Sequence, residues 1–167
     1  IGLMSVGYVP TFPAEALAQP ASIAELSTEE ALARARELNY RIVELHIQGR
    51  YAEAEPLALE ALAIHESVAG ENHPDTAGSL NNLAMLYQVK GDYDAALPMF
   101  ERALSIRETA LGNEHILTAV SLDSLAGLYQ ILGRYEEAIP LYERALAIRE
   151  SELGEKDPEV ANVLSNL

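Results

Sequence analysis

The chain has 167 residues, 49% of them hydrophobic and none of them cysteine, a length that suits one domain or one short solenoid. Its net charge of −15 argues against nucleic acid as a partner, because phosphate backbones would be repelled. The missing cysteines exclude disulfides and thiolate metal sites. No apolar run reaches the length of about 18 residues that predicts a membrane-spanning helix.

Residues 1–26 precede any periodic pattern. Glycines and prolines interrupt this apolar segment and prevent one long helix. The tripeptide Ala16-Leu17-Ala18 resembles a signal-peptidase site, so one interpretation is the end of a secretory signal. The other interpretation is a retained extended arm that docks on a neighbouring subunit through its apolar side chains, Ile1, Leu3, Val6 and Tyr8. Both interpretations favour export from the cytoplasm, to the periplasm or outside the cell.

From residue 27 onward the sequence is periodic. Gly49-Arg50-Tyr51 recurs as Gly91-Asp92-Tyr93 and again as Gly133-Arg134-Tyr135. The same shift aligns prolines, isoleucines and a further set of glycines, which are Pro56, Pro98 and Pro140, Ile64, Ile106 and Ile148, and Gly70, Gly112 and Gly154. A regular period of about 42 residues predicts a stack of related structural units.

Each unit predicts two antiparallel helices. In the second unit the first helix runs from about Pro74 to Lys90, with apolar residues three or four positions apart, and Gly91 ends it. Asp92 is the expected cap of the second helix, which runs to about Leu111. Because one helix pair cannot bury its apolar faces alone, the pairs must stack. The fold class is therefore all-α, a solenoid of about three units over residues 27–167, plus the first helix of a fourth.

The first helix departs from the repeat. Arg41 and Glu44 stand where Leu83 and Leu86 stand one unit later. No earlier unit covers this helix, so we interpret the polar residues as an end cap of the solenoid. Its start also carries the pattern of a capping box, formed by Ser27 and Glu30.

The other end of the chain is apolar. Residues 158–167 predict the first helix of a fourth unit without its partner helix. Either the natural protein continues or another chain covers the exposed side chains, which include Val163, Leu164 and Leu167.

The four histidines give little support for a metal site. His73 and His115 share one position before a helix, and Asp157 takes that position in the next unit. A polar group that caps the helix explains this pattern better than a metal ligand, which would need further converging ligands. His46 and His65 have no recurring partner, and we expect both at the surface.

Enzymatic chemistry also lacks a motif. Glu136 and Glu137 lie in the first turn of a predicted helix, where the helix dipole favours carboxylates. No phosphate-binding loop, nucleophile elbow or dinucleotide fingerprint is present. We predict no enzymatic activity, no cofactor and no metal.

The residues of the second unit carry a family resemblance. Residues 79–87, with the sequence SLNNLAMLY, then Gly91-Asp92-Tyr93, then residues 96–104 resemble a tetratricopeptide repeat. The long repeat and the loop 112–115 are similar to the kinesin-light-chain type, which is also widespread in bacteria and favours a bacterial source. The resemblance covers about residues 30–167 and implies a right-handed α-solenoid that binds protein partners on its concave face.

The resemblance also assigns the concave face to exposed positions on the first helix of each pair. By register these are Asn39, Val43, His46, Asn81, Met85, Gln88, Asp123, Gly127 and Gln130. Asn and Gln can bond an extended peptide backbone in both directions, and Val43 and Met85 offer apolar contact. Met85, Asp123 and Gly127 take the places of residues that clamp a terminal carboxylate in some relatives, which disfavours that kind of receptor.

Two functions of different kinds follow. The first is a non-enzymatic scaffold for protein–protein interaction, which binds a peptide, a partner helix or a neighbouring subunit. The alternative is a self-assembling structural subunit of an extracellular filament or oligomer, built through the N-terminal arm and the open solenoid end. A third, a regulatory domain of a larger enzyme, is more remote.

Overall fold

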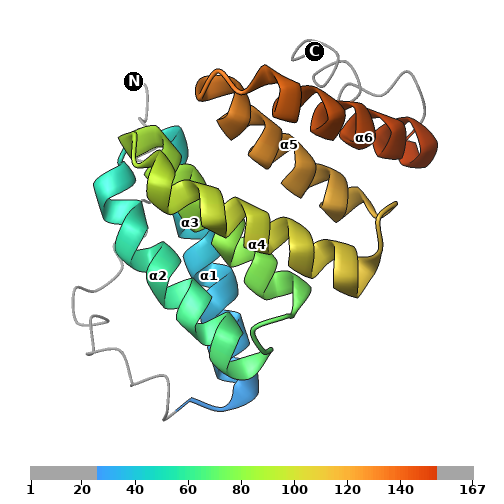
Figure 1. The fold of residues 1–167 in the computed structure, drawn as a ribbon. Coiled ribbons are helices and arrows are strands. Elements are labelled where there is room, and N and C mark those ends of the chain that lie inside the picture. The colour runs from blue at the N-terminus through green and yellow to red at the C-terminus, as the bar shows by residue number, and fades with distance from the viewer. Residues whose placement is uncertain (1–25, 154–167) are drawn as a thin grey trace, which may run out of the picture.

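A computed structural model describes residues 26–153 of the chain. No strand occurs in that range, and the backbone forms six helices joined by short loops (Figure 1). They are α1 (Thr28–Ile47), α2 (Tyr51–Val68), α3 (Pro74–Lys90), α4 (Tyr93–Leu111), α5 (Ile116–Ile131) and α6 (Tyr135–Leu153). The predicted boundaries in the second unit, at Pro74, Lys90 and Leu111, are confirmed.

The helices are arranged as three antiparallel pairs, α1–α2, α3–α4 and α5–α6, that stack in chain order (Figure 1). Helices α2 and α4 also contact the first helix of the following pair. In addition, α1 contacts α3 and α3 contacts α5, so the first helices of successive pairs lie side by side. The all-α solenoid predicted from the period of the sequence is confirmed.

Small residues let the helices approach closely. Ala54, Ala84, Ala96 and Ala126 are fully buried, and larger side chains such as Phe100 fill the grooves beside them. Two of the hydrophobic clusters combine residues from adjacent pairs, so the core is continuous along the stack. Each fully buried Leu or Phe contributes about 1.5–3 kcal/mol, so packing within pairs and packing between neighbouring pairs both stabilise the stack.

The helix ends follow the expected capping chemistry. The backbone N–H of Ser27 donates to Glu30 Oε2 over 2.9 Å, and the N–H of Glu30 donates to Ser27 Oγ, which confirms the capping box. The Ser27 hydroxyl also donates to Glu30 Oε2, over 2.6 Å, and this hydrogen bond, together with the one from the Ser27 N–H, lowers the pKa of the Glu30 carboxyl. Gly91 adopts a left-handed conformation, with φ of 81°, and Asp92 then caps α4 by accepting from the N–H of Ala95.

The two loop histidines cap helices, as predicted. His73 Nδ1 accepts a hydrogen bond from the N–H of Asp75, and His115 Nδ1 accepts one from the N–H of Leu117 over 3.0 Å. Each imidazole therefore satisfies a backbone donor at the start of α3 or α5.

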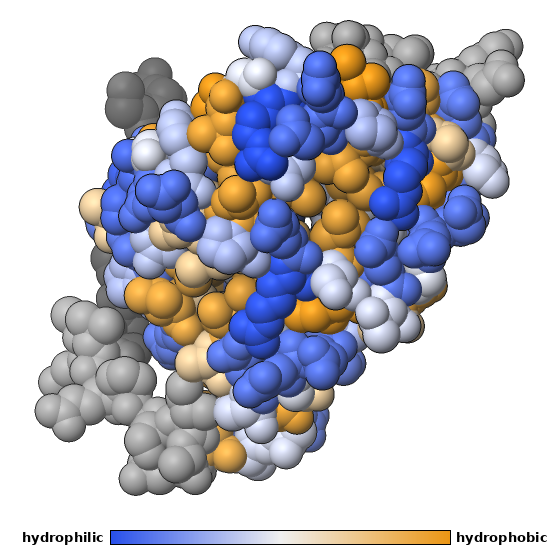
Figure 2. All heavy atoms as spheres, viewed as in Figure 1, coloured by the Kyte–Doolittle hydropathy of each residue, from blue (hydrophilic) through white to orange (hydrophobic). Residues whose placement is uncertain are grey.

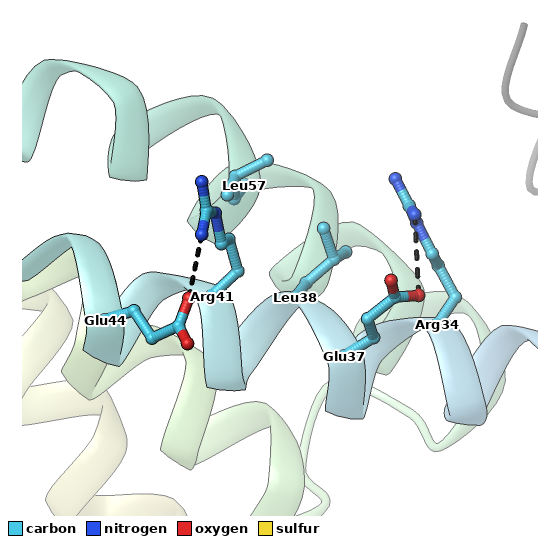
Figure 3. A pocket seen from close by; sticks show the side chains of 6 residues that line it. All are labelled: Arg34, Glu37, Leu38, Arg41, Glu44 and Leu57. Atoms are coloured by element: carbon cyan, nitrogen blue, oxygen red, sulfur yellow. Dashed lines mark hydrogen bonds and ion pairs between the residues drawn. The ribbon is translucent and has the colours of Figure 1, made fainter. Parts of the chain in front are cut away.

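The outward face of α1 is polar, as expected for an end of the stack. Figure 3 shows Arg34, Glu37, Arg41 and Glu44 along this face, with Leu38 of α1 between them and Leu57 on the neighbouring helix α2. Arg41 Nη1 donates to Glu44 Oε2 over 2.8 Å. One unit later, Leu83 and Leu86 are buried against the first pair. The interpretation of Arg41 and Glu44 as a polar end cap is therefore supported by their exposure to solvent.

Candidate functional site

The face formed by α1, α3 and α5 carries most of the positions that the sequence assigned to partner binding. Two pockets lie on it, one largely apolar and one polar. Together they run from α1 across α3 to α5, and we call this region the groove.

The apolar pocket lies between α1 and α3 and has a volume of about 180 Å³. Three predicted residues, Val43, His46 and Met85, meet in its wall, where Ile42, Asn82 and Leu86 complete the lining. The imidazole of His46 also packs edge-on against the ring of Tyr51, which fixes one side of the pocket. The pocket has room for one apolar side chain of a partner.

The polar pocket is larger, at about 560 Å³, and adjoins the apolar one through Asn82. It extends from α1 across α3 to α5. Its lining residues are Leu32, Arg36, Asn39, His65, Pro74, Asp75, Gly78, Asn81, Asn82, Arg107, Leu117 and Val120.

Amide side chains connect α1 to α3 within the groove. Asn82 Nδ2 donates to Asn39 Oδ1 over 3.3 Å. Asn81 Nδ2 lies 3.6 Å from Met85 Sδ, and only 6% of Asn81 is exposed. The sequence predicts Asn81 at the surface, whereas Asn82, half-buried and lining both pockets, faces the groove more openly.

The third pair uses its predicted residues differently. Asp123 forms an ion pair with Arg149 of α6 and is half-buried. Gln130 is exposed and accepts a hydrogen bond from Tyr142 Oη over 3.1 Å. Neither Asp123 nor Gln130 lines the two pockets of the groove, and neither does Gln88 of α3, which is half-buried.

Two basic residues of the second helices, His65 and Arg107, line the polar pocket and form the floor of the groove, and this was missed from the sequence. His65, Arg107 and Arg149 occupy the same position in successive repeats and are all at least nine-tenths buried. The expectation that His65 lies at the surface is wrong: it is 5% exposed, because its ring packs against α3, where Nδ1 lies 2.7 Å from Ser79 Oγ. Burial lowers the pKa of His65. The period alone would have aligned these three residues.

Several predicted residues lie outside the described part of the chain. The arm residues Ile1, Leu3, Val6 and Tyr8 fall in residues 1–25, and Val163, Leu164 and Leu167 fall in residues 154–167. Their part in self-association stays a prediction.

The described helices offer neither a metal cluster nor a membrane span. Between residues 26 and 153, no group of three or more His, Cys, Asp or Glu side chains is placed to hold a metal ion. Within the same range, no helix combines the length and the apolar character needed to cross a bilayer. Figure 2 shows hydrophilic side chains over much of one face, with hydrophobic ones between them.

The family model of the tetratricopeptide repeat matches the sequence in three overlapping segments, residues 42–109, 75–151 and 117–167. These matches cover most of the chain, which belongs to the tetratricopeptide repeat family. The tetratricopeptide repeat is a scaffold for protein–protein interaction, and the fold places the chain in this class.

Solved structures of kinesin-light-chain-like repeats resemble the chain. A putative kinesin light chain from Podosopora anserina with nearly identical repeats matches with a TM-score of 0.74 and 28% identity, over 80% of this chain and 64% of that one. A variant of the same Podosopora anserina protein matches with a TM-score of 0.73 and 26% identity, over 80% and 63%. BtubC (BKLC) from P. vanneervenii matches with a TM-score of 0.66 and 28% identity, over 86% and 62%.

The chain therefore spans less than two thirds of the length of each of these structures. No curated protein matches the sequence. The resemblance to the kinesin-light-chain type, drawn from the long repeat, is confirmed by the structural neighbours.

Proposed function

We propose that the chain is a non-enzymatic scaffold that binds an extended peptide of a partner protein in the groove formed by α1, α3 and α5. The observation that carries this proposal is the juxtaposition of the apolar pocket and the polar pocket along one face. A peptide that follows the groove would place an apolar side chain in the first and its polar groups over the second.

The chemistry of the groove suits an extended backbone. Asn39 and Asn82 supply amide donors and acceptors next to one another, held by their mutual hydrogen bond. Val43, which is 52% exposed, and Met85 supply adaptable apolar contact beside them. A preformed groove of this kind binds with little reorganisation, which favours affinity.

Selection of random linear peptides tests this function. Dodecapeptides displayed on phage are selected against the immobilised full chain, and the recovered peptides are measured by calorimetry. We expect peptides with dissociation constants in the micromolar range, on the order of −8 kcal/mol of binding free energy. Failure to recover any peptide that binds the free chain in solution would contradict the proposal.

A matched pair of variants locates the binding site. Val43→Glu places a charge at the apolar pocket, and we expect it to weaken binding at least about tenfold, or about 1.4 kcal/mol. Leu59→Glu makes the same kind of change on α2, outside both pockets, at a side chain of similar exposure, 47% against 52%. We expect Leu59→Glu to leave the affinity unchanged. Equal losses in the two variants would place the peptide elsewhere.

The self-assembling filament stays a hypothesis. It depends on residues 1–26 and on the C-terminal residues after 153, which lie outside the described range apart from Leu26. Light scattering at several protein concentrations distinguishes the two hypotheses. The molar mass of a peptide-binding scaffold stays that of the monomer, whereas the molar mass of filaments rises with concentration.

A further inference from the structure

The two junctions between helix pairs are bridged by side chains at equivalent positions but with different chemistry. At the first junction, between α2 and α3, His65 Nδ1 lies 2.7 Å from Ser79 Oγ. At the second junction, between α4 and α5, Arg107 Nη1 donates to Ser121 Oγ over 2.8 Å and to the carbonyl oxygen of Leu117 over 3.0 Å. A guanidinium stays charged throughout the physiological range, whereas an imidazole gains its charge near neutral pH. Only the first junction is therefore bridged by a titratable group.

The surroundings of His65 favour the neutral imidazole. The residue is 5% exposed, and this burial lowers its pKa from the ordinary value of 6.5, while the smaller effect of Asp75 opposes that change. The other charged or titratable groups around it are His73 before α3, Arg36 of α1 and Arg107 of α4, the two arginines lining the same pocket. One carboxylate among these basic groups does not offset the burial, so docking of the first pair excludes a proton from His65.

The first pair is also placed to undock on its own. In the described part of the chain, α1 and α2 have a neighbouring pair on one side only (Figure 1). Because each repeat of a solenoid contacts only its neighbours, an end pair opens at a lower free energy than the whole stack. The ion pairs that α2 forms across this junction, Glu55 with Lys90 and Glu66 with Arg102, are partly exposed, and such pairs contribute little.

The apolar pocket of the groove depends on this junction. One wall belongs to α1 and the other to α3, with the lining residues Ile42, Val43 and His46 on the first and Asn82, Met85 and Leu86 on the second. Undocking of the first pair therefore separates the two walls and removes the pocket.

We propose that the first helix pair is a pH switch of the groove, in which protonation of His65 undocks α1 and α2 from α3 and so dismantles the apolar pocket. Above about pH 6.5 the imidazole is neutral, and the docked pair is favoured. As the pH falls below this value, the undocked pair binds a proton that the docked pair excludes, so the undocked fraction rises. One pH unit lower, at pH 5.5, the ratio of undocked to docked pairs rises by at most about tenfold. The switch goes beyond the proposed function, because it concerns the junction and not the ligand.

Hydrogen exchange of the full chain tests the switch. Protection factors of backbone amides, corrected for the intrinsic exchange rate at each pH, are measured at pH 7.5 and pH 5.5. We expect protection in α1 and α2 to fall by about fivefold to tenfold at the lower pH, and protection in α5 and α6 to stay nearly constant. Equal losses in the first and third pairs would show that the chain opens only as a whole, and they would overturn the switch, as would constant protection in both.

The other three histidines of the chain provide controls. His73 and His115 cap α3 and α5 in the same way, so a change in the caps would affect both junctions alike. His46 lines the apolar pocket but does not bridge the junction between α2 and α3. We expect His65→Gln to abolish the loss of protection in α1 and α2 at pH 5.5, and His46→Gln to retain it. The opposite result would overturn the role of His65.

Two exchanges between the junctions complete the test. Arg107→His places an imidazole beside Ser121, and we expect it to extend the loss of protection at pH 5.5 to α5 and α6. His65→Arg gives the first junction the side chain of the second and should remove the pH dependence, so the test does not depend on the folding of one variant. A pH dependence that persists in both His65→Arg and His65→Gln would overturn the proposal. These measurements use the free chain, so failure of the switch and failure of peptide binding are separate results.

Discussion

The first and second helix pairs have the same architecture but opposite surfaces on the side that faces the N-terminal end of the stack. On α1 that side carries Arg41 and Glu44, exposed and paired with each other (Figure 3). On α3 the equivalent Leu83 and Leu86 are buried against α1 and α2. The difference teaches that the presence of a neighbouring pair decides what each repeat position must be.

The largest expected effect comes from placing a glutamate at Leu86 of α3, because α1 has Glu44 at the equivalent position. Leu86→Glu buries a carboxylate without a partner at a side chain that is 1% exposed, so we expect the free energy of unfolding to fall by at least about 3 kcal/mol. Urea denaturation followed by circular dichroism measures the loss. The reverse change at the end, Glu44→Leu, should alter stability by less than about 1 kcal/mol. Comparable losses at the two sites would contradict the stacked arrangement.

The next largest loss of stability is expected from removing the N-terminal cap of α1. Removing the Ser27 hydroxyl in Ser27→Ala breaks the hydrogen bonds to Glu30 and should lower the free energy of unfolding by about 1 kcal/mol. Ser105→Ala makes the same change at an exposed position inside α4, where we expect no loss. Thermal unfolding of both variants distinguishes a cap from a general effect of losing a serine.

A smaller gain is expected in the middle of α3. Gly78 stands where α1 has Arg36, and no close contact opposes a side chain there. Gly78→Ala should therefore raise the free energy of unfolding by about 0.5–1 kcal/mol, since Ala favours the helix over Gly. Gly91→Ala should lower it, because Gly91 has a φ of 81°. Thermal melts of these two variants should move in opposite directions.

The smallest expected effect is a pH dependence of the free energy of unfolding, which His65 of the first pair should cause and Arg107 of the second pair should not. Burial lowers the pKa of His65 from the ordinary value of 6.5, so the unfolded chain binds the proton more readily. The free energy of unfolding should therefore fall as the pH drops below about 6.5. In His65→Gln this part of the decline should disappear, while Arg107 stays charged throughout. Denaturation curves at pH 7.5 and 5.5 provide the comparison, and an identical decline in the variant would contradict the assignment.

The period made the helices, their order and their caps predictable. The period of the sequence located α3 and α4 correctly. The caps formed by Ser27, His73 and Asp92 could also be predicted, because they depend only on the local sequence. The polar end cap on α1 could be predicted because its residues depart from the repeat at one end of the stack.

The floor of the groove was not predicted, because it depends on contacts between helices. His65 and Arg107 look like surface residues or members of an apolar face when helices are examined singly, yet each reaches the following pair, at Ser79 and Ser121. The burial of Asn81 likewise follows from how closely α3 packs on its neighbours rather than from its place in the repeat.

The methyl groups of Met85 and Met99 test the central claim, that a partner peptide occupies the groove formed by α1, α3 and α5. Met85 lines the apolar pocket, whereas Met99 packs against the core from α4. With ¹³C-labelled methionine methyls, titration of a selected peptide should shift the Met85 resonance strongly and leave that of Met99 almost unmoved. A shift at Met99 with none at Met85 would contradict the account.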